Sequence, residues 1–422
     1  MPQASGCAVV VAALLVGAAG GQAATLTISC GSNAADAEFC GRYAQEWGRQ
    51  HGHEVRIYSA PASATDNLAL LRQQFAARSA SLDVVTIDVV WPGVLKDHLV
   101  DLKRYSGGAE AQHFPAIVAN NTIAGRLLGM PWYTDAGLLF YRKDLLQKYG
   151  LELPRTWPEL AAAARRIQDG ERAAGSADFQ GYVFQGRAYE GLTCNALEWI
   201  SSYGGGSVVD PHGRVTIHNA QAARALDEAA SWIGTITPRG VLNYGEEEAR
   251  GVWQNGQAAF MRNWPYAWAM SQAGDSVIRG KVGVAPLPAG DGAGARSAAT
   301  LGGWQLAVSR YSRHVPEAAA LVMYLTSAEI QKRRAIGGAY NPTLPALYRD
   351  PELLAANPFM GELAEVFENA VARPATPTGL KYPAVSRAFW DATHEVLSGR
   401  MDGAAAVRRL EGRLLQTRRA KW

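Results

Sequence analysis

The segment after the first 24 residues alternates between strand-like and helix-like patterns, and this alternation limits the possible folds more than any other feature of the chain. Short runs rich in β-branched residues are separated by stretches in which apolar residues recur with helical spacing. The predicted elements, beginning with a strand, are Thr25–Cys30, Ala34–Gln50, Glu54–Ala60, Asn67–Arg78 and Asp83–Val89. Strands joined through helices at this spacing form a parallel sheet with right-handed crossovers, so the sequence predicts an α/β fold.

A loop with polar residues follows each of these predicted strands. Ligands of open parallel sheets bind beyond the carboxyl ends of the strands. The corresponding loops cover Gly31–Asp36, Ala62–Asn67 and Asp88–Trp91. We therefore expect part of a binding site in these loops.

The remainder of the chain predicts more helices and strands, without repeats and without a long linker. Thr156 and Glu159 are spaced as a capping box, with Pro158 in the first turn of the helix that follows. Further helices are predicted over Ala222–Ile233, Glu246–Phe260 and Pro316–Thr326, and a strand over Leu301–Val308. Because no linker separates two halves, we expect the chain to cross several times between lobes.

The first 24 residues predict export. No charged residue occurs before Asp36, and the run from Cys7 to Ala19 is almost entirely apolar. This run is shorter than the roughly 20 residues that span a bilayer, and small residues follow it. The pattern is typical of a signal peptide over residues 1–24, cleaved near Ala23 or Ala24, although its first residues lack the usual Lys or Arg. No later run reaches transmembrane length, so we expect a soluble, exported mature chain.

Two of the four cysteines, Cys30 and Cys40, lie close together in the exported part of the chain. An exported protein meets an oxidising compartment, in which disulfides persist. We therefore hypothesise a disulfide between Cys30 and Cys40. Cys194 then remains as an unpaired, buried thiol.

The sequence lacks the short motifs of common cofactor-dependent and hydrolytic enzymes. The Gly-rich stretch Ala289–Ser297 lacks the spacing of a dinucleotide-binding loop, and Gly274–Lys281 lacks the hydroxyl residue of a phosphate loop. His-Glu-x-x-His, Cys-x-x-Cys and Gly-x-Ser-x-Gly are absent as well. A formal net charge of +3 does not indicate a nucleic-acid partner. We expect no cofactor, no metal and no catalysis, although a glycosidase needs only two carboxylates, which spacing does not exclude.

Five further stretches are distinctive when taken together. They are TIDVVW (Thr86–Trp91), GMPWYTDAGLLFYRKDLLQKYG (Gly129–Gly150), FQGRAYEGLTC (Phe184–Cys194), WQNGQAAFMRNWPYAW (Trp253–Trp268), and KVGVAPLP with LGGW (Lys281–Pro288 and Leu301–Trp304). In this order and at these separations they resemble the extracellular solute-binding proteins of bacterial and archaeal ABC sugar importers, above all the trehalose/maltose-binding branch. The similarity runs from about Thr25 to Arg373, nearly the whole mature chain.

The resemblance implies a two-lobed periplasmic-binding-protein fold with hinge crossover strands and a ligand cleft between the lobes. The first lobe would comprise residues 25–130 and 304–342, and the second residues 131–303 and 343–422. The chain would cross near Gly129–Trp132, near Pro288–Trp304 and near Gly337–Leu344. The lobes would close on the ligand, and the closed form would engage a membrane permease.

The resemblance also implies which residues contact a sugar. A sugar presents rows of hydroxyl groups and apolar C–H faces, so its recognition combines charged hydrogen-bonding groups with aromatic rings. The expected hydrogen-bonding residues are Asp88, Tyr133, Asp135, Glu190 and Arg373. The expected stacking and close-packing residues are Trp264, Tyr266, Gly303 and Trp304.

The chain departs from the relatives' pattern at two further positions that we expect to bind ligand. Asp36 stands where the relatives carry a glutamate, which is one methylene longer, and Asn67 stands near the place of an arginine. An asparagine cannot reproduce the forked donor of an arginine. We expect both differences to affect which disaccharide fits.

One function and two alternatives follow from these observations. We expect a monomeric periplasmic protein that binds a disaccharide, with trehalose favoured over maltose or sucrose. It would deliver the sugar to the permease subunits of an ABC importer in the inner membrane. A secreted glycoside hydrolase that uses two of Asp88, Asp135 and Glu190 is the first alternative. A binding protein for another small polar solute is the second.

Overall fold

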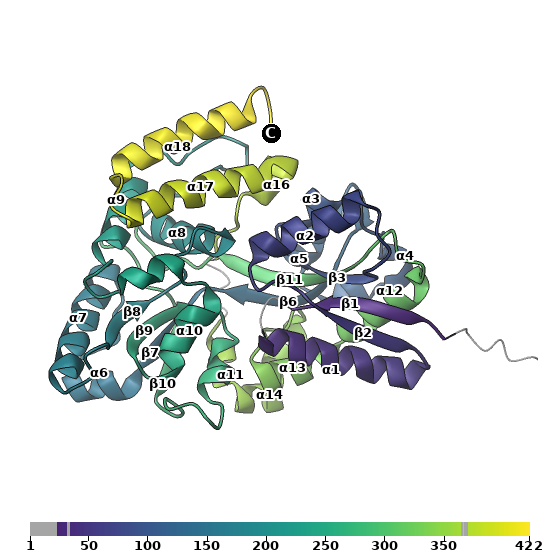
Figure 1. The fold of residues 1–422 in the computed structure, drawn as a ribbon, viewed down its shortest axis with the longest axis horizontal. Coiled ribbons are helices and arrows are strands. Elements are labelled where there is room, and N and C mark those ends of the chain that lie inside the picture. Colours follow the sequence, from purple (N-terminus) through teal and green to yellow (C-terminus); the bar gives the residue numbers. More distant parts are fainter. Residues whose placement is uncertain (1–22, 32–33, 364–365, 367–369) are drawn as a thin grey trace, which may run out of the picture.

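The structure, a computed structural model, describes residues 23–422 except 32–33, 364–365 and 367–369. The signal peptide expected over residues 1–24 therefore lies, apart from its last two residues, outside the described residues. The described chain forms two lobes side by side, with strands running from one toward the other (Figure 1). None of the described helices is both long enough and apolar enough to cross a bilayer.

The first lobe is built on a five-stranded sheet in the order β2-β1-β3-β11-β6. Its strands are β1 (Thr25–Cys30), β2 (Glu54–Ser59), β3 (Val84–Asp88), β6 (Met130–Ala136) and β11 (Leu301–Val308). β1 is parallel to β2 and β3, as the alternation predicts, whereas β11 is antiparallel to β3 and β6. Helices α1 (Ala34–His51) and α12 (Val315–Leu325) contact this sheet.

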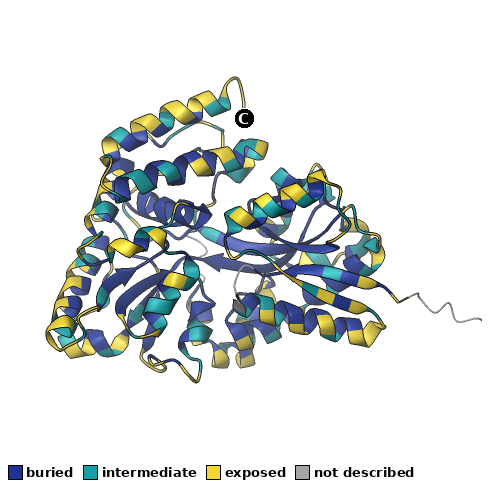
Figure 2. Cartoon of the chain, in the orientation of Figure 1, coloured by how far each residue is buried: buried dark blue, intermediate teal, exposed yellow. Residues whose placement is uncertain are grey.

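The second lobe is built on a four-stranded sheet in the order β10-β7-β9-β8. Its strands are β7 (Leu138–Arg142), β8 (Gln180–Val183), β9 (Ala258–Asn263) and β10 (Val282–Ala285). The larger helices of this lobe are α6 (Lys143–Tyr149), α7 (Trp157–Ala173), α8 (Glu190–Ser202), α9 (Ala220–Ser231), α10 (Glu246–Gln254), α17 (Tyr382–Leu397) and α18 (Gly403–Arg418). In both lobes the central strands are buried, whereas the edge strand β2 and the outer helix faces are largely exposed (Figure 2).

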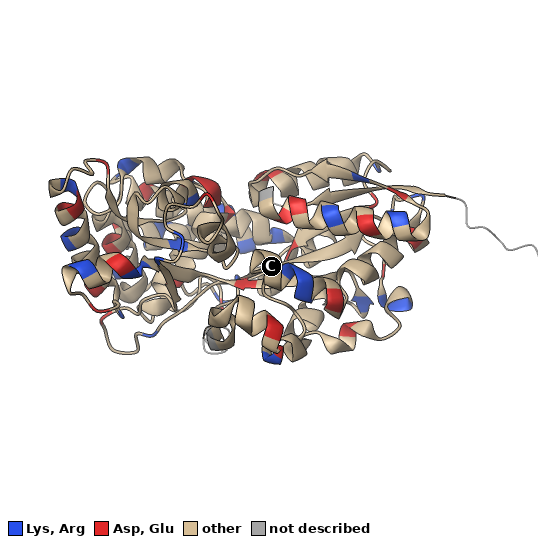
Figure 3. Ribbon diagram, turned by 90° about the horizontal axis from the view of Figure 1, so that it is seen from below, with Lys and Arg blue, Asp and Glu red and all other residues tan. Residues whose placement is uncertain are grey.

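The described chain contains further α-helices and short strands. They are α2 (Ala64–Ala76), α3 (Pro92–Leu95), α4 (Lys103–Ser106), α5 (Pro115–Asn121), β4 (Thr122–Ile123), β5 (Arg126–Leu127), α11 (Ala267–Ser271), α13 (Ala328–Gly338), α14 (Pro351–Ala356) and α16 (Ala375–Thr378). On the outer helices, basic and acidic residues are interspersed (Figure 3). Several of them form exposed ion pairs, such as Arg42 with Glu38 and Lys148 with Glu171. Exposed pairs of this kind contribute little to stability, so the lobes depend on their buried cores.

Within the described residues the chain passes between the lobes in three segments. The first is at Gly137, between β6 and β7. A Cβ atom added there would lie 2.1 Å from Glu198 Oε1 and 2.6 Å from Arg262 Nη2, so a side chain does not fit. The second segment is 286–300, between β10 and β11, and the third follows α13, where the chain joins the core of the second lobe. The residue boundaries of the lobes expected from the sequence stay a prediction.

The secondary structure agrees with the sequence patterns except in one segment. β1 and β11 span the predicted residues, and Thr156 forms the predicted capping box at the start of α7. The helix predicted over Glu246–Phe260 is wrong in its second half, because α10 ends at Gln254 and β9 follows. Gly256 adopts a left-handed φ of +74°, which ends the helix. β9 then lies between β7 and β8, so sheet pairing decides its conformation.

A disulfide joins the end of β1 to helix α1. Cys30 and Cys40 are bonded to each other, their Cα atoms lie 5.7 Å apart, and both residues are buried. Cys194 is a free, buried thiol in α8. The bond ties α1 to the sheet against which it packs.

We expect this disulfide to stabilise the folded chain by about 2–3 kcal/mol, because it restricts a short loop in the unfolded state. A Cys30→Ala/Cys40→Ala variant should lose that much free energy of unfolding in urea denaturation. Cys194→Ala is the control, since it removes a thiol without removing a crosslink. Peptide mapping by mass spectrometry that finds free thiols at both positions, in protein purified from an oxidising compartment, would contradict the disulfide.

Candidate functional site

A cleft of about 880 Å³, including space open to solvent, lies between the two lobes. Nine of the eleven residues expected to bind ligand line it: Asp88, Tyr133, Asp135, Glu190, Trp264, Tyr266, Gly303, Trp304 and Arg373. The cleft therefore brings together residues that lie far apart in the sequence.

The sheet of the first lobe positions one wall of the cleft. Asp88 is the last residue of β3, and Tyr133 and Asp135 lie two residues apart on β6, on the same face of the strand. Trp304 on β11 lies between them, in register with Asp88 on one side and Tyr133 on the other. A Cβ atom added at Gly303, which has a φ of +124°, would lie 2.6 Å from the Tyr133 carbonyl oxygen. A glycine is therefore required where β11 approaches β6.

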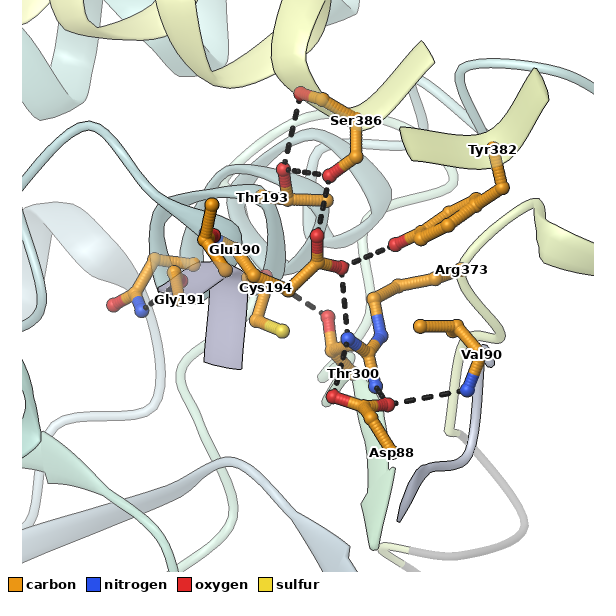
Figure 4. A network of polar contacts seen from close by, with 12 residues as sticks. Asp88, Val90, Glu190, Gly191, Thr193, Cys194, Thr300, Arg373, Tyr382 and Ser386 are labelled. Carbon is orange, nitrogen blue, oxygen red and sulfur yellow. Dashed lines mark hydrogen bonds and ion pairs between the residues drawn. The ribbon is translucent and has the colours of Figure 1, made fainter. Parts of the chain in front are cut away.

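A network of ion pairs connects the two lobes at the cleft (Figure 4). Arg373 Nη2 donates to Asp88 Oδ1 over 2.6 Å, and Arg373 Nη1 donates to Asp88 Oδ2 over 3.2 Å and to Glu190 Oε1 over 2.8 Å. The Val90 N–H group donates to Asp88 Oδ1 over 3.1 Å. The three charged side chains are at most 10% exposed, so each depends on its partners for the solvation that water would supply.

Two residues of helix α17 donate hydrogen bonds to Glu190, the member of this network in the second lobe. The Tyr382 hydroxyl donates to Glu190 Oε1, and Ser386 Oγ donates to Glu190 Oε2 over 2.7 Å. Thr193 in turn lies within hydrogen-bonding distance of Ser386, 2.7 Å between their hydroxyl oxygens. Burial raises the pKa of Asp88, and the positive charge of Arg373 acts against that rise. The C-terminal part of the chain, where the family resemblance is weakest, thus supports the site.

Asp135 differs from the other carboxylates of the cleft because it has no hydrogen-bond or ion-pair partner among the described residues. It is 7% exposed, and no described residue donates a hydrogen bond to its side chain or forms an ion pair with it. Burial raises its pKa to about 7, and the nearby carboxylate of Asp36 adds to the rise while Arg334 and Arg262 oppose it. Asp135 is therefore a buried acceptor available to a bound molecule.

Aromatic rings form the other faces of the cleft. The ring of Trp264 lies over the guanidinium of Arg262, with Cζ 3.9 Å from the ring centroid. Its Nε1 donates to Glu246 Oε1 over 3.4 Å, and a Cβ atom added at Gly302 would lie 3.0 Å from its ring. The Tyr266 hydroxyl donates to Glu247 Oε1 over 2.7 Å. These contacts fix the planes of the rings that face the cleft.

The guanidinium behind Trp264 belongs to a fully buried ion pair. Arg262 Nε donates to Glu198 Oε2 over 2.9 Å, and Arg262 Nη1 donates to Gln185 Oε1 over 3.1 Å. Glu198 Oε1 also accepts from the Thr300 N–H group over 3.1 Å. Neither charged side chain has any exposed surface, so loss of one partner would leave an uncompensated charge in the core.

Asp36 and Asn67, the two remaining expected residues, do not line the cleft. Both are completely buried. Asp36 accepts a hydrogen bond from the Tyr133 hydroxyl over 3.1 Å and forms an ion pair with Arg334, so it supports Tyr133 from behind. The amide atoms of Asn67 have no hydrogen-bond partner among the described residues. Direct ligand contact at Asp36 and Asn67 therefore stays a prediction, although neither residue is among those that line the cleft.

Several residues that line the cleft were missed by the sequence reasoning. They include Arg187, Tyr189, Gly191, Cys194, Glu246, Glu247, Glu248 and Tyr340, whereas Ala62 and Ala64, which also line the cleft, lie in the loop Ala62–Asn67 that was expected to form part of a site. The run of three glutamates at the start of α10 was the available signal for this wall of the cleft. Acidic residues at a helix start are often caps, however, and Glu248 Oε2 does accept from the Gly245 N–H group over 2.7 Å. Within the described part of the chain, no cluster of three or more His, Cys, Asp or Glu side chains could hold a metal ion.

Comparison with known proteins agrees with this geometry. The family of bacterial extracellular solute-binding proteins matches residues 33–332. A probable ABC transporter-binding protein of Deinococcus radiodurans is 52% identical over 402 residues, which is 95% of each chain. The structure of maltose-bound MalE3 of T. maritima is 40% identical with a TM-score of 0.87, and the match covers 93% of this chain and 99% of that one.

A more distant structure shares the fold. A D-mannitol-bound solute-binding protein of Agrobacterium vitis is 22% identical with a TM-score of 0.79, over 93% of this chain and 98% of that one. The likeness to MalE3 confirms the two-lobed α/β fold expected from the sequence. The relatives are solute-binding proteins and not enzymes. The chain therefore belongs to the bacterial extracellular solute-binding proteins of ABC transporters.

Proposed function

We propose that this protein is the substrate-binding component of a bacterial ABC sugar importer and that it binds a disaccharide in the cleft between its lobes. One observation carries this proposal: the cleft combines the aromatic faces of Trp264 and Tyr266 with the unengaged, buried carboxylate of Asp135. Aromatic rings cover the apolar C–H faces of a sugar, and a carboxylate accepts strong hydrogen bonds from its hydroxyl groups.

Two arguments support a disaccharide, with trehalose and maltose as the first candidates and sucrose as the third. The sequence stretches at the cleft resemble the trehalose/maltose-binding branch, which favours trehalose. The MalE3 structure, at 40% identity, contains maltose, which supports maltose. Both sugars consist of two glucose rings, so one arrangement of acceptors and aromatic faces serves either.

The alternative of a glycoside hydrolase is not supported. Such an enzyme needs a general acid and a second carboxylate that are free to act on the substrate. Asp88 and Glu190 are both paired with Arg373, which leaves Asp135 alone among the three candidates. The relatives are also binding proteins. A smaller polyol is the remaining alternative, since the A. vitis protein of the same fold binds D-mannitol.

We also propose where the protein acts and with what. It is exported to the periplasm after cleavage near Ala23 or Ala24, and it delivers its ligand as a monomer to the permease subunits in the inner membrane. The disulfide between Cys30 and Cys40 supports an oxidising compartment. A cleft lined by both lobes supports closure of the lobes around the ligand.

Calorimetry with trehalose, maltose, sucrose and mannitol tests the ligand. We expect at least one disaccharide to bind with a micromolar dissociation constant, equivalent to about −8 kcal/mol, and mannitol to bind more weakly. Tight binding of mannitol together with no binding of any disaccharide would establish the polyol alternative instead.

The stacking role of Trp264 predicts a large loss of affinity on truncation. Trp264→Ala should weaken disaccharide binding by about 2 kcal/mol or more, as the removal of a buried aromatic anchor often does. Trp268→Ala is the matched control, because Trp268 has similar exposure but packs against Phe359 and does not line the cleft. Unchanged affinity in Trp264→Ala, measured by calorimetry, would refute the stacking role.

The raised pKa of Asp135 predicts that binding depends on pH. With a pKa of about 7, the carboxylate is mostly ionised at pH 8 and mostly protonated at pH 6. The ionised form is the stronger acceptor, so affinity should fall about tenfold, or roughly 1.4 kcal/mol, between pH 8 and pH 6. Asp135→Asn should bind more weakly at pH 8 and lose this dependence. A persistent pH dependence in Asp135→Asn would assign it to another group, such as Asp36 or Asp88.

A further inference from the structure

Arg187 lies in the loop between β8 and α8, and its side chain lines the cleft. Backbone hydrogen bonds hold this loop in place. The Arg187 N–H group donates to the Tyr244 carbonyl oxygen over 3.1 Å, and the Tyr189 N–H group donates to the Arg187 carbonyl oxygen over 2.9 Å. The side chain is half-buried, so its guanidinium is presented to the cleft from a fixed backbone.

The two arginines among the described lining residues differ in their partners. Arg373 is bound by Asp88 and Glu190. The guanidinium of Arg187 makes no ion pair and no hydrogen bond with any described residue. It lies over the ring of Tyr189, with Cζ 4.5 Å from the ring centroid. This contact restrains the guanidinium while its N–H donors stay available, since a cation–π contact does not use them.

Three glutamates of the first turn of α10 also line the cleft, but each is engaged elsewhere. Glu246 accepts from the Tyr189 hydroxyl over 2.5 Å, Glu247 from Tyr266, and Glu248 from the Gly245 N–H group. Glu246 thereby holds the ring on which Arg187 rests. These acids shape the wall of the cleft, and none of the three forms an ion pair with Arg187.

We propose that Arg187 is a ligand-contacting, specificity-determining residue whose forked N–H donors bind two adjacent hydroxyl oxygens of the bound sugar. This inference rests on the proposed function, because it takes the ligand to be a sugar. A planar guanidinium offers paired donors at a fixed separation, which matches two neighbouring acceptors better than it matches one. The site therefore selects a sugar ring with two adjacent free hydroxyl groups.

The position of Arg187 also gives the ligand a role in joining the lobes. Asp135 is an unengaged acceptor on β6 of the first lobe, and Arg187 is an unengaged donor in the second lobe. A polyhydroxy ligand that donates to Asp135 and accepts from Arg187 connects the two lobes through itself.

Calorimetry with maltose and with trehalose, on the mature chain, tests this inference with three variants. Arg187→Ala and Arg187→Lys should each bind the preferred disaccharide at least tenfold more weakly than the unmodified protein. The lysine variant keeps the charge but loses the fork. Arg239→Ala, which removes an exposed arginine of the same lobe outside the cleft, should bind as the unmodified protein does. Melting temperatures should be equal in all variants, since Arg187 makes no buried ion pair.

Monodeoxy derivatives of the preferred disaccharide test whether the contact is direct. For the hydroxyl groups that Arg187 binds, removal should weaken binding to the unmodified protein but not to Arg187→Ala. Two results would overturn the inference and leave the proposed function intact. One is equal affinity of Arg187→Ala and the unmodified protein for the disaccharide. The other is a loss of affinity that is as large in Arg187→Ala as in the unmodified protein for every deoxy derivative. Full affinity in Arg187→Lys would overturn forked recognition. No binding of trehalose, maltose or sucrose by the unmodified protein would reject the proposed disaccharide function and this inference together.

Discussion

The ion pairs of Arg373 with Asp88 and Glu190 are the interaction on which the arrangement of the site depends. Asp88 ends β3 of the first lobe and Glu190 begins α8 of the second, so one guanidinium sets the spacing of the lobes on that side of the cleft. The Glu190 N–H group donates to the Thr65 hydroxyl over 3.2 Å, which adds a second contact between lobes. Buried charges are tolerated only when each is paired and hydrogen-bonded, and the Tyr382 hydroxyl helps to complete that pairing.

Two other buried arginines support the aromatic walls from behind. Arg262 pairs with Glu198 beneath Trp264, and Arg334 pairs with Asp36 while its Cζ lies 4.8 Å from the ring centroid of Tyr133. Cation–π contacts are stronger when both partners are desolvated, so these pairs orient the rings as well as neutralising charge. Because the protein uses most of its buried charges internally, the cleft retains few charged groups for a ligand. That balance suits a neutral molecule with many hydroxyl groups.

Much of the fold could be predicted from local pattern because apolar residues recur with different periods in strands and in helices. β1 and β11 occur where alternation and β-branched residues predict strands, and the capping box at Thr156 starts α7 as expected. The failure at β9 has a physical cause. Its residues Ala258–Asn263 have no strong intrinsic preference, and pairing with β7 and β8, which come from distant parts of the chain, decides their conformation.

The sequence by itself determined the family, the α/β alternation and most of the residues that meet at the cleft, because these depend on local spacing and on short stretches shared with relatives. The tertiary structure alone decided which of the charged residues are engaged. Asp36 meets Arg334 across 298 positions and Asp88 meets Arg373 across 285, and both pairings exist only in the folded chain. No local pattern states which carboxylate a distant guanidinium will reach. For that reason Asp36 became a support behind Tyr133, while Asp135 and Arg187 were left facing the cleft without partners among the described residues.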